Sequence, residues 1–399
     1  MSRSHDRDHR KVVHEETAPL FLPYGPLSAL DTEGDEVMRR WILRSTLVAT
    51  VSSLALAAAA PLPAAPPGGT YTVTPLVSDV AGAAAVTDPH LVNAWGLTRS
   101  ATSPWWVADN GTDLSTLYNA AGVPQPQPQP LVVGVDGGPT GVVFAGIPGQ
   151  FQVGTTVTPT ALGTANFIFA SEDGMIRAWR GGSTAALVTA HGGPGAIYKG
   201  LAIAQPTPGN PLLYAADFHN ARVDVFNGAW QNVTPADSFV DPMLPGGYAP
   251  FGIQTIGSRL FVSYAKQDAE AADEVAGEGR GFVDAYDLGG HLLARVAQHG
   301  QLNAPWGLAM APASFDRFAG DLLVGNFGDG QINAYEETAS GFEHRGTLRD
   351  STTGGKLVID GLWALEFGNA GSNGNPDTLF FTAGPDDESH GLFGTITTG

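Results

Sequence analysis

Residues 303–310 read NAPWGLAM, and residues 93–98 read NAWGLT. Both segments place a Gly before an apolar residue, and the same pattern recurs four more times. The further copies are PTGVV (139–143), YKGLA (198–202), PFGIQ (250–254) and DGLWA (360–364). The six glycines are separated in turn by 45, 59, 52, 55 and 54 residues. Internal periods of about 20 to 50 residues are typical of repeat architectures in which each copy folds as one small unit.

Each copy continues as a series of short apolar strands. The second strands read, for example, WWVADN (105–110) and LLYAAD (212–217), and a third strand reads ARVDVFNG (221–228). Period-two alternation ended by Gly, Asn or Asp predicts strands joined by tight turns. A fourth, weaker strand closes most copies. The sequence therefore predicts six sheets of about four strands each.

The two ends of the repeat region complement one another. The sixth copy has no fourth strand, whereas YTVTPLVSDVAG (71–82) alternates like a strand and precedes the first copy. Pairing of this segment with GLFGTIT (391–397) would close a ring and leave no open sheet edge. A solenoid would leave both ends uncapped. We therefore predict an all-β fold, a single six-bladed β-propeller over residues 71–397, closed by its N-terminal strand.

The repeated glycines have a physical reason in such a ring. Gly at the start of an innermost strand lets neighbouring blades converge on the axis, where a Cβ would collide. Gly96 and Gly307 are four copies apart. Trp95 and Trp306 are therefore expected at corresponding positions beside the axis.

Composition narrows the classes of function. The 399 residues contain no Cys, which excludes disulfides and thiolate metal sites. Removing the first 65 residues, which hold 7 Lys or Arg and 8 Asp or Glu, leaves 13 basic and 31 acidic residues and a net charge of −18. A surface of this sign repels phosphate backbones, so nucleic acid is not expected as a partner.

The first 65 residues differ from the rest. Residues 38–65 have arginines at 39, 40 and 44 near their start, continue with an uncharged run over 45–60, and end in small residues and Pro. This order is typical of an export signal, and the 16-residue run is shorter than the roughly 20 residues of a membrane-spanning helix. We predict a cleaved signal peptide rather than an anchor, loosely of the twin-arginine type, and a periplasmic or extracellular product without a stable membrane span. Residues 1–37 are interpreted as a disordered extension or a mis-assigned start.

One face of a propeller collects the starts of the innermost strands and the ends of the second strands. We call this face the axial mouth. The residues predicted there combine aromatic side chains with a few polar groups, as in many ligand sites. The predicted ligand-binding residues are Trp95, Lys199, Phe251, Trp306, Asp360, Tyr264 and Phe327. The alternative for each is structural, because axial aromatics commonly fill the ring and polar residues at strand ends commonly cap turns.

Other polar residues at the same strand ends suggest a metal or catalysis. Asp109, Asp217 and Asn326 are candidate ligands for Ca²⁺ or another divalent cation, which prefers carboxylate and amide oxygens. No calcium-loop spacing surrounds them. His219, in a mouth loop, is a candidate acid or base. The segment AKQDAEAADEVAGEGRG (265–281) is expected to be a solvated loop.

The sequence leaves the question of catalysis open. It has no G-x-S-x-G elbow, H-E-x-x-H, Walker loop or dinucleotide fingerprint. The first hypothesis is a monomeric binding module that takes a small molecule, glycan or protein at the axial mouth. The alternative is a divalent-metal-dependent hydrolase or lactonase with ligands on the axis, which rests on analogy between folds. A scaffold that acts through its blade edges is a third hypothesis.

Several segments also resemble known repeats. LLYAADFHNARVDVF (212–226) resembles the second and third strands of NHL repeats, and APWGLAM (304–310) the turn that opens one. Together with VTDPHLVNAWGL (86–97), GDLLVGNFGDGQINAY (320–335) and LFFTAGPDDESHGLFGTI (379–396), they are similar to an exported bacterial propeller family. That family is known only as conserved hypothetical proteins, and some members carry a PEP-CTERM sorting tail. The resemblance implies export and a six-bladed fold, without catalytic residues.

Overall fold

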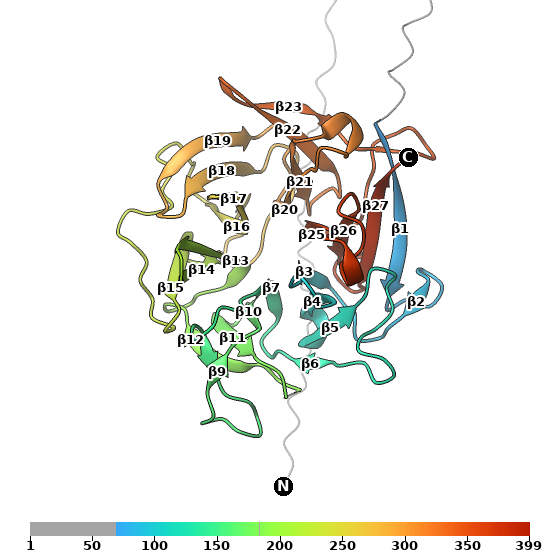
Figure 1. The fold of residues 1–399 in the computed structure, drawn as a ribbon. Helices are drawn as coiled ribbons and strands as arrows, with labels where there is room; N and C mark the ends of the chain where they lie inside the picture. Colours follow the sequence, from blue (N-terminus) through green and yellow to red (C-terminus); the bar gives the residue numbers. More distant parts are fainter. Residues whose placement is uncertain (1–68, 183) are drawn as a thin grey trace, which may run out of the picture. The chain divides into compact units, whose positions relative to one another are not determined.

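The computed structural model describes residues 69–182 and 184–399, so the extension and signal predicted for residues 1–65 lie outside it. The described residues form small antiparallel sheets that fan around a common centre (Figure 1). Their only helices are short 3-10 turns, and none is long and apolar enough to cross a bilayer. The prediction of an all-β, six-bladed β-propeller is confirmed.

The first three blades follow the chain from the inside outward. Blade one contains β3 (Ala94–Thr98), β4 (Trp105–Asp109), β5 (Leu114–Tyr118) and β6 (Val133–Gly134). Blade two contains β7 (Pro139–Phe144), β10 (Phe167–Ser171), β11 (Met175–Trp179) and β12 (Leu187–His191), with an inserted hairpin of β8 (Gln152–Val153) and β9 (Gly163–Thr164). Blade three has three strands, β13 (Tyr198–Thr207), β14 (Asn210–Asp217) and β15 (Arg222–Asn227). Beyond β15 there is only an isolated bridge between Phe226 and Asn232, and three prolines over 235–245 lack the N–H that a further ladder needs.

The other three blades complete the ring. Blade four contains β16 (Tyr248–Ile256), β17 (Arg259–Lys266), β18 (Phe282–Asp287) and β19 (Leu292–Gln298). Blade five contains β20 (Pro305–Met310), β21 (Leu322–Asn326), β22 (Ile332–Thr338) and β23 (Gly341–Thr347). Blade six contains β25 (Leu362–Phe367), β26 (Leu379–Ala383), β27 (Leu392–Thr398) and, outermost, β1 (Thr70–Ser78). The short strands β2 (Val86–Thr87) and β24 (Arg349–Asp350) pair with β1.

The predicted closure of the ring is present. β1 pairs antiparallel with β27, from Tyr71 opposite Thr398 to Ser78 opposite Leu392 (Figure 1). The register shifts between Pro75 and Val77, where a bulge accommodates the proline. The N-terminal strand thus supplies the fourth strand that the last repeat lacks.

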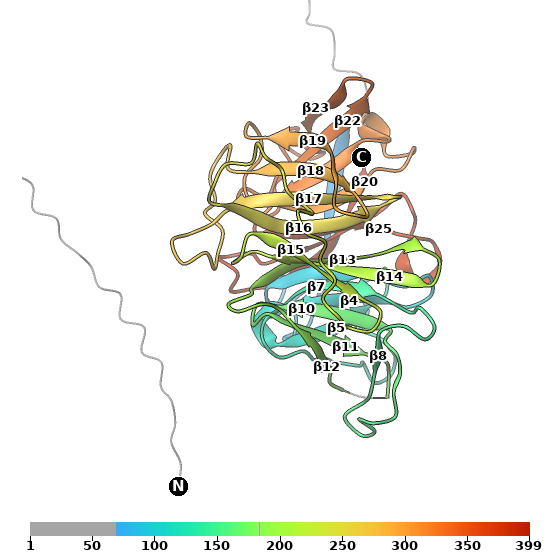
Figure 2. The ribbon, with the colours of Figure 1, turned by 90° about the vertical axis from the view of Figure 1, so that its left-hand side faces the viewer.

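Apolar side chains hold neighbouring blades together. Six buried clusters in the described part of the chain each draw residues from two successive blades. A seventh, centred on Trp95, Phe251 and Trp363, occupies the axis. Figure 2 shows the blades from the side, with the sheet of β13–β15 stacked against that of β16–β19. Stability is therefore distributed around the ring, because each sheet buries both faces against its neighbours.

The glycines of the repeat allow the innermost strands to meet. A Cβ on Gly200 would lie 2.6 Å from the carbonyl oxygen of Phe251, and a Cβ on Gly252 would lie 2.1 Å from that of Trp306. Both distances are far below van der Waals contact. The backbones at the axis are thus closer than any residue with a side chain permits.

The sixth copy requires a correction. A Cβ on Gly307 would lie 2.5 Å from the carbonyl oxygen of Trp363, so the sixth counterpart of the Trp–Gly pair is Trp363–Ala364 and not Asp360–Gly361. Gly361 has a φ of 62° and lies three residues before Ala364. Asn93 (47°) and Ala304 (45°) have the same left-handed backbone and lie three residues before Gly96 and Gly307. The Gly in DGLWA serves this left-handed turn.

Candidate functional site

The axial mouth is closed from below by aromatic side chains. We call Trp95, Trp306, Trp363, Phe251, Phe327 and Phe218 the aromatic plug. The Trp363 ring centroid lies 3.8 Å from that of Trp95, and Phe327 stacks on Trp363 at 4.1 Å. Trp306 and Phe251 lie 5.9 and 5.8 Å from Trp363. Four predicted ligand-binding aromatics are thus brought together, but they pack against one another and fill the axis.

Hydrogen bonds fix the orientation of the plug. The indole nitrogens of Trp95 and Trp363 both donate to Oδ1 of Asn93, at 2.9 and 3.0 Å. The indole of Trp306 donates to the carbonyl oxygen of Lys199 at 3.2 Å. The left-handed turn at Asn93 places its amide directly above two tryptophans, which explains why an Asn precedes the AWGL segment.

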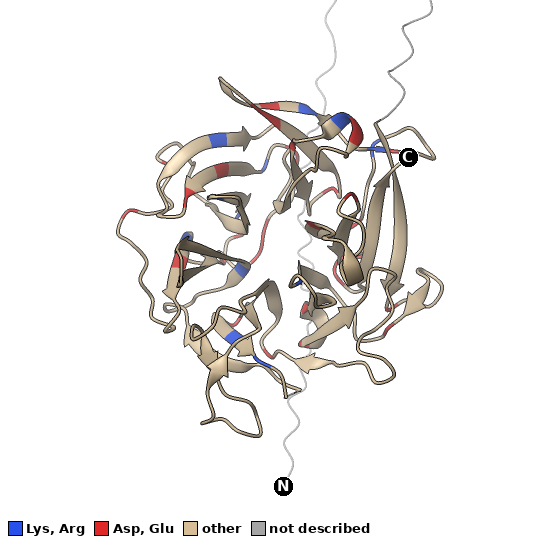
Figure 3. Ribbon diagram, viewed as in Figure 1, with Lys and Arg blue, Asp and Glu red and all other residues tan. Residues whose placement is uncertain are grey.

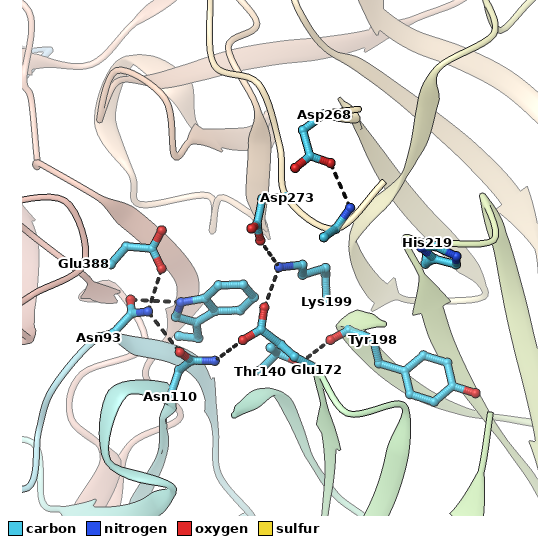
Figure 4. A network of polar contacts seen from close by, with 12 residues as sticks. Asn93, Asn110, Thr140, Glu172, Tyr198, Lys199, His219, Asp268, Asp273 and Glu388 are labelled. Carbon is cyan, nitrogen blue, oxygen red and sulfur yellow. Dashed lines mark hydrogen bonds and ion pairs between the residues drawn. The ribbon is translucent and has the colours of Figure 1, made fainter. Parts of the chain in front are cut away.

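A polar network covers the plug, and Figure 4 shows it at close range. Nζ of Lys199 lies 2.5 Å from Oε1 of Glu172 and 2.9 Å from Oδ1 of Asp273, and 5.0 Å from the Trp95 ring centroid. The amide of Asn110 donates to Glu172 at 3.0 Å, and that of Asn93 donates to Glu388 at 2.6 Å. We call Lys199, Glu172, Asp273, Asn110, Asn93 and Glu388 the Lys199 network. It joins side chains from five blades, one, two, three, four and six, at the axial mouth.

The electrostatics of the network keep the lysine charged. The Lys199 side chain is only 1% exposed, and burial alone would lower its pKa. The carboxylates of Glu172 and Asp273 reverse that effect, so its pKa is raised. A lysine in this state is an ammonium and is not a nucleophile. Lys199 therefore acts as a fixed positive charge.

More acidic side chains than basic ones lie around the Lys199 ammonium at the axial mouth. Burial raises the pKa of Glu274 to about 8, although Lys199 opposes the shift. Burial likewise raises the pKa of Glu388, with the Asn93 hydrogen bond opposing. Lys and Arg elsewhere are spread over several blades rather than gathered at the mouth (Figure 3). The mouth therefore presents Glu172, Asp273, Glu274 and Glu388 around one ammonium.

The blade-four loop, predicted to be merely solvated, covers part of the mouth. It brings Asp273 to Lys199, and the amide of Gln267 donates to the carbonyl oxygen of Phe218 at 2.6 Å. Nδ1 of His219 lies 3.3 Å from the carbonyl oxygen of Ala271 in the same loop. His219, the candidate acid or base, is therefore placed against this loop.

Two predicted ligand-binding residues lie away from the network. Tyr264 is buried between blades three and four, and its hydroxyl lies 2.6 Å from that of Tyr286. Asp360 is exposed and accepts the backbone N–H of Asp386 at 2.9 Å. Trp363 takes the position expected for Asp360, because the glycine used to align the sixth copy belongs to another turn.

The candidate metal ligands remain in separate blades. Asp217 accepts hydrogen bonds from Asn220 at 2.8 Å and from the N–H of Ile197 at 3.3 Å, and so caps its own turn. The amide of Asn326 donates to the carbonyl oxygen of Gln301 at 2.7 Å. Asp109 is fully buried in blade one, and burial raises its pKa well above the usual range. Within residues 69–182 and 184–399, no three His, Asp or Glu side chains are grouped closely enough to hold a metal ion.

Most of the Lys199 network, and Trp363 of the aromatic plug, were not predicted. Trp363 had a visible signal, because LWAL (362–365) repeats the Trp–Gly–Leu motif with Ala in place of Gly. Asn93 had one too, since it precedes the first copy of that motif. Glu172, Asp273 and Glu388 come from loops of three blades, and no spacing in the sequence relates them.

The fold and the filled axis define a six-bladed β-propeller with a closed central channel. Two proteins of Acanthamoeba polyphaga mimivirus are similar over most of the chain. Uncharacterized protein L690 is 30% identical over 352 residues, covering 82% of this chain and 86% of the relative. Uncharacterized protein R648 is 29% identical over 344 residues, covering 82% and 80%. The chain belongs to the family of these mimivirus proteins. No family model matches the sequence.

Solved structures provide a second comparison. A streptogramin B lyase structure has a TM-score of 0.45 and 11% identity, and the match covers 82% of this chain and 98% of that one. A structure of virginiamycin B lyase from Staphylococcus aureus has a TM-score of 0.43 and 13% identity, with coverage of 77% and 95%.

Proposed function

We propose that the protein is a binding propeller that holds a cationic ligand, an amine or a basic protein segment, at the acidic axial mouth. The observation that carries the proposal is the charge imbalance of the mouth. Four acidic side chains, those of Glu172, Asp273, Glu274 and Glu388, surround the single ammonium of Lys199, and with a pKa of about 8 the Glu274 carboxyl stays largely protonated at neutral pH until a further cation compensates it. The raised pKa values of Glu274 and Glu388 indicate that their ionised forms lack sufficient compensation, which a cationic ligand would supply.

Two features favour binding over catalysis. Lys199 is held as an ammonium and so offers no nucleophile. The aromatic plug fills the axis directly below the network, so a ligand would lie on the mouth rather than enter a deep cavity. Such a surface suits recognition of a charged group through ion pairs with the acidic side chains.

The test is a binding titration with matched charge variants. Isothermal titration calorimetry with spermidine and with a Lys-rich peptide should detect binding that weakens as salt is added. Glu388→Gln and Asp273→Asn should each weaken binding several-fold. Glu343→Gln, an exposed site on blade five, removes the same charge elsewhere and should have little effect. Binding that ignores salt and all three substitutions, or that favours a Glu-rich peptide, would contradict the proposal.

The metal-dependent hydrolase stays a prediction with a separate test. Asp109, Asp217 and Asn326 would have to leave their present positions in three blades to share one ion. Elemental analysis of the purified protein, with an ester and lactone screen in the presence and absence of chelator, measures this directly.

Export also stays a proposal, supported by the residue order of 38–65. It agrees with the resemblance to exported bacterial propellers. Expression of the full chain in a bacterium, followed by N-terminal sequencing of the periplasmic fraction, should give a product that begins near residue 66. An uncleaved chain in the cytoplasm would contradict export.

A further inference from the structure

A pocket lies at the end of the axis opposite the axial mouth. Its volume is about 200 Å³, and the far ends of the innermost strands line it. We call it the exit pocket. A cavity of only about 30 Å³, bordered by Trp306, Gly96 and Gly141, lies along the innermost strands toward the aromatic plug. That volume holds no more than one or two water molecules, so the exit pocket is separate from the mouth.

The exit pocket contains one charge of each sign. Arg99, at the end of β3, and Glu366, in β25, both line it. Nη2 of Arg99 donates to the carbonyl oxygen of Phe367 at 2.7 Å but lies 3.6 Å from Oε1 of Glu366. That separation is too long for a hydrogen bond. The two side chains therefore form an ion pair at the pocket without a direct hydrogen bond between them.

Other polar groups at the pocket are also incompletely satisfied. Nε of Arg99 and Oγ1 of Thr255 are buried and have no hydrogen-bond partner among the described residues. Burial raises the pKa of Glu366 to about 7, with Arg99 opposing the shift. Buried polar atoms without partners are costly and usually indicate a missing water or ligand. Leu97, Val142 and Ile203 supply an apolar wall beside them.

We propose that the exit pocket binds a small zwitterion of the amino-acid class. The guanidinium of Arg99 receives the carboxylate, since Arg and carboxylate groups pair in a planar geometry. The carboxylate of Glu366 receives the ammonium group. The apolar wall takes a short aliphatic side chain. The volume is below the roughly 300 to 1,000 Å³ of sites for drug-sized molecules, so the ligand is small.

The experiment is a titration of the purified protein with the L-α-amino acids, each up to about 10 mM, by calorimetry and thermal shift. At least one aliphatic amino acid should bind. The corresponding amine without a carboxylate, and the acid without an amine, should bind at least about tenfold more weakly, because each loses one charge-assisted hydrogen bond. Glucose, a neutral polyol of similar size, should not bind.

Variants locate the binding. Glu366→Gln keeps the shape of the pocket and should weaken amino-acid binding about tenfold or more. Gln254→Phe, which fills the pocket from its half-buried position, should abolish binding with the Arg99–Glu366 pair intact. Glu343→Gln is the control and should bind normally. Absence of binding by every amino acid, equal binding of glucose or of the single-group analogues, or undiminished binding by both pocket variants would each overturn the proposal.

Discussion

Replacing Lys199 by Met is expected to destabilise the propeller by about 2 kcal/mol at neutral pH. Removal of one partner from a fully buried ion pair costs about 3 to 5 kcal/mol, because the other charge is left uncompensated. Lys199 is 1% exposed, but Glu172 is 33% and Asp273 70% exposed, so water can solvate both carboxylates after the change. The cost is therefore at the lower side of that range or below it.

Thermal unfolding provides the assay. The unfolding entropy is about 2.1 cal/mol/K per residue, or about 0.7 kcal/mol/K for a body of about 330 residues, so 2 kcal/mol lowers Tm by about 3 °C. Lys356→Met removes an exposed lysine and should change stability by less than about 0.5 kcal/mol. At about pH 3, where carboxyl groups are generally protonated, the Lys199 variant should approach the native protein.

Two results would refute this reasoning. A Lys199→Met protein as stable as the native one at neutral pH would show that the network does not need its cation. An equal loss of stability in the Lys356 variant would show that the effect is one of overall charge and does not arise at the mouth.

Three further predictions concern the mouth and the ring. The pKa of Glu274 is raised to about 8 in the folded protein, so its contribution to stability is present below the ordinary Glu pKa and is lost as the pH rises through 8. The free energy of unfolding, measured with urea, should therefore be lower at pH 8 than at pH 5. Glu274→Gln should flatten this decline. By the same assay, Trp363→Ala should lower the free energy of unfolding by about 3 to 5 kcal/mol, and Asp360→Ala by less than about 1 kcal/mol. Equal losses would favour Asp360–Gly361, and not Trp363–Ala364, as the sixth counterpart of the Trp–Gly pair. A chain that starts at residue 80 lacks β1 and exposes the edge of β27, so size-exclusion chromatography should show aggregates or oligomers; a stable monomer would mean that closure is dispensable.

The fold could be predicted because its determinants repeat. Strand alternation, the glycines at the axis and the missing fourth strand of the last copy each recur or complement one another along the chain. The one alignment error arose at Gly361, where a glycine required for a left-handed turn resembled a glycine required for close packing. Gly favours both sites, but for different physical reasons, and other residues take each of them in some blades: Asn93 and Ala304 the left-handed turn, Ala364 the axial position.

The candidate site could be predicted only in part. Trp95, Trp306 and Lys199 follow from their places in the repeat, and the structure brings them together. Whether aromatics around an axis line a cavity or fill it depends on their packing, which a repeat pattern does not specify. The acidic partners come from loops of different length, and a loop's path is fixed by contacts such as those of Gln267 rather than by periodicity.

The pairing of β1 with β27 also sets the order of events during synthesis. Ser78 pairs with Leu392, which leaves the ribosome 314 residues later. At about 5 to 20 residues per second, β1 waits roughly 15 to 60 s for its partner. Throughout that interval the backbone donors that later pair with β27 have no such partner, and an unpaired strand edge can pair with other chains. Pro75, placed at the bulge, has no N–H to donate, so this segment offers one donor fewer to a wrong partner until the ring closes.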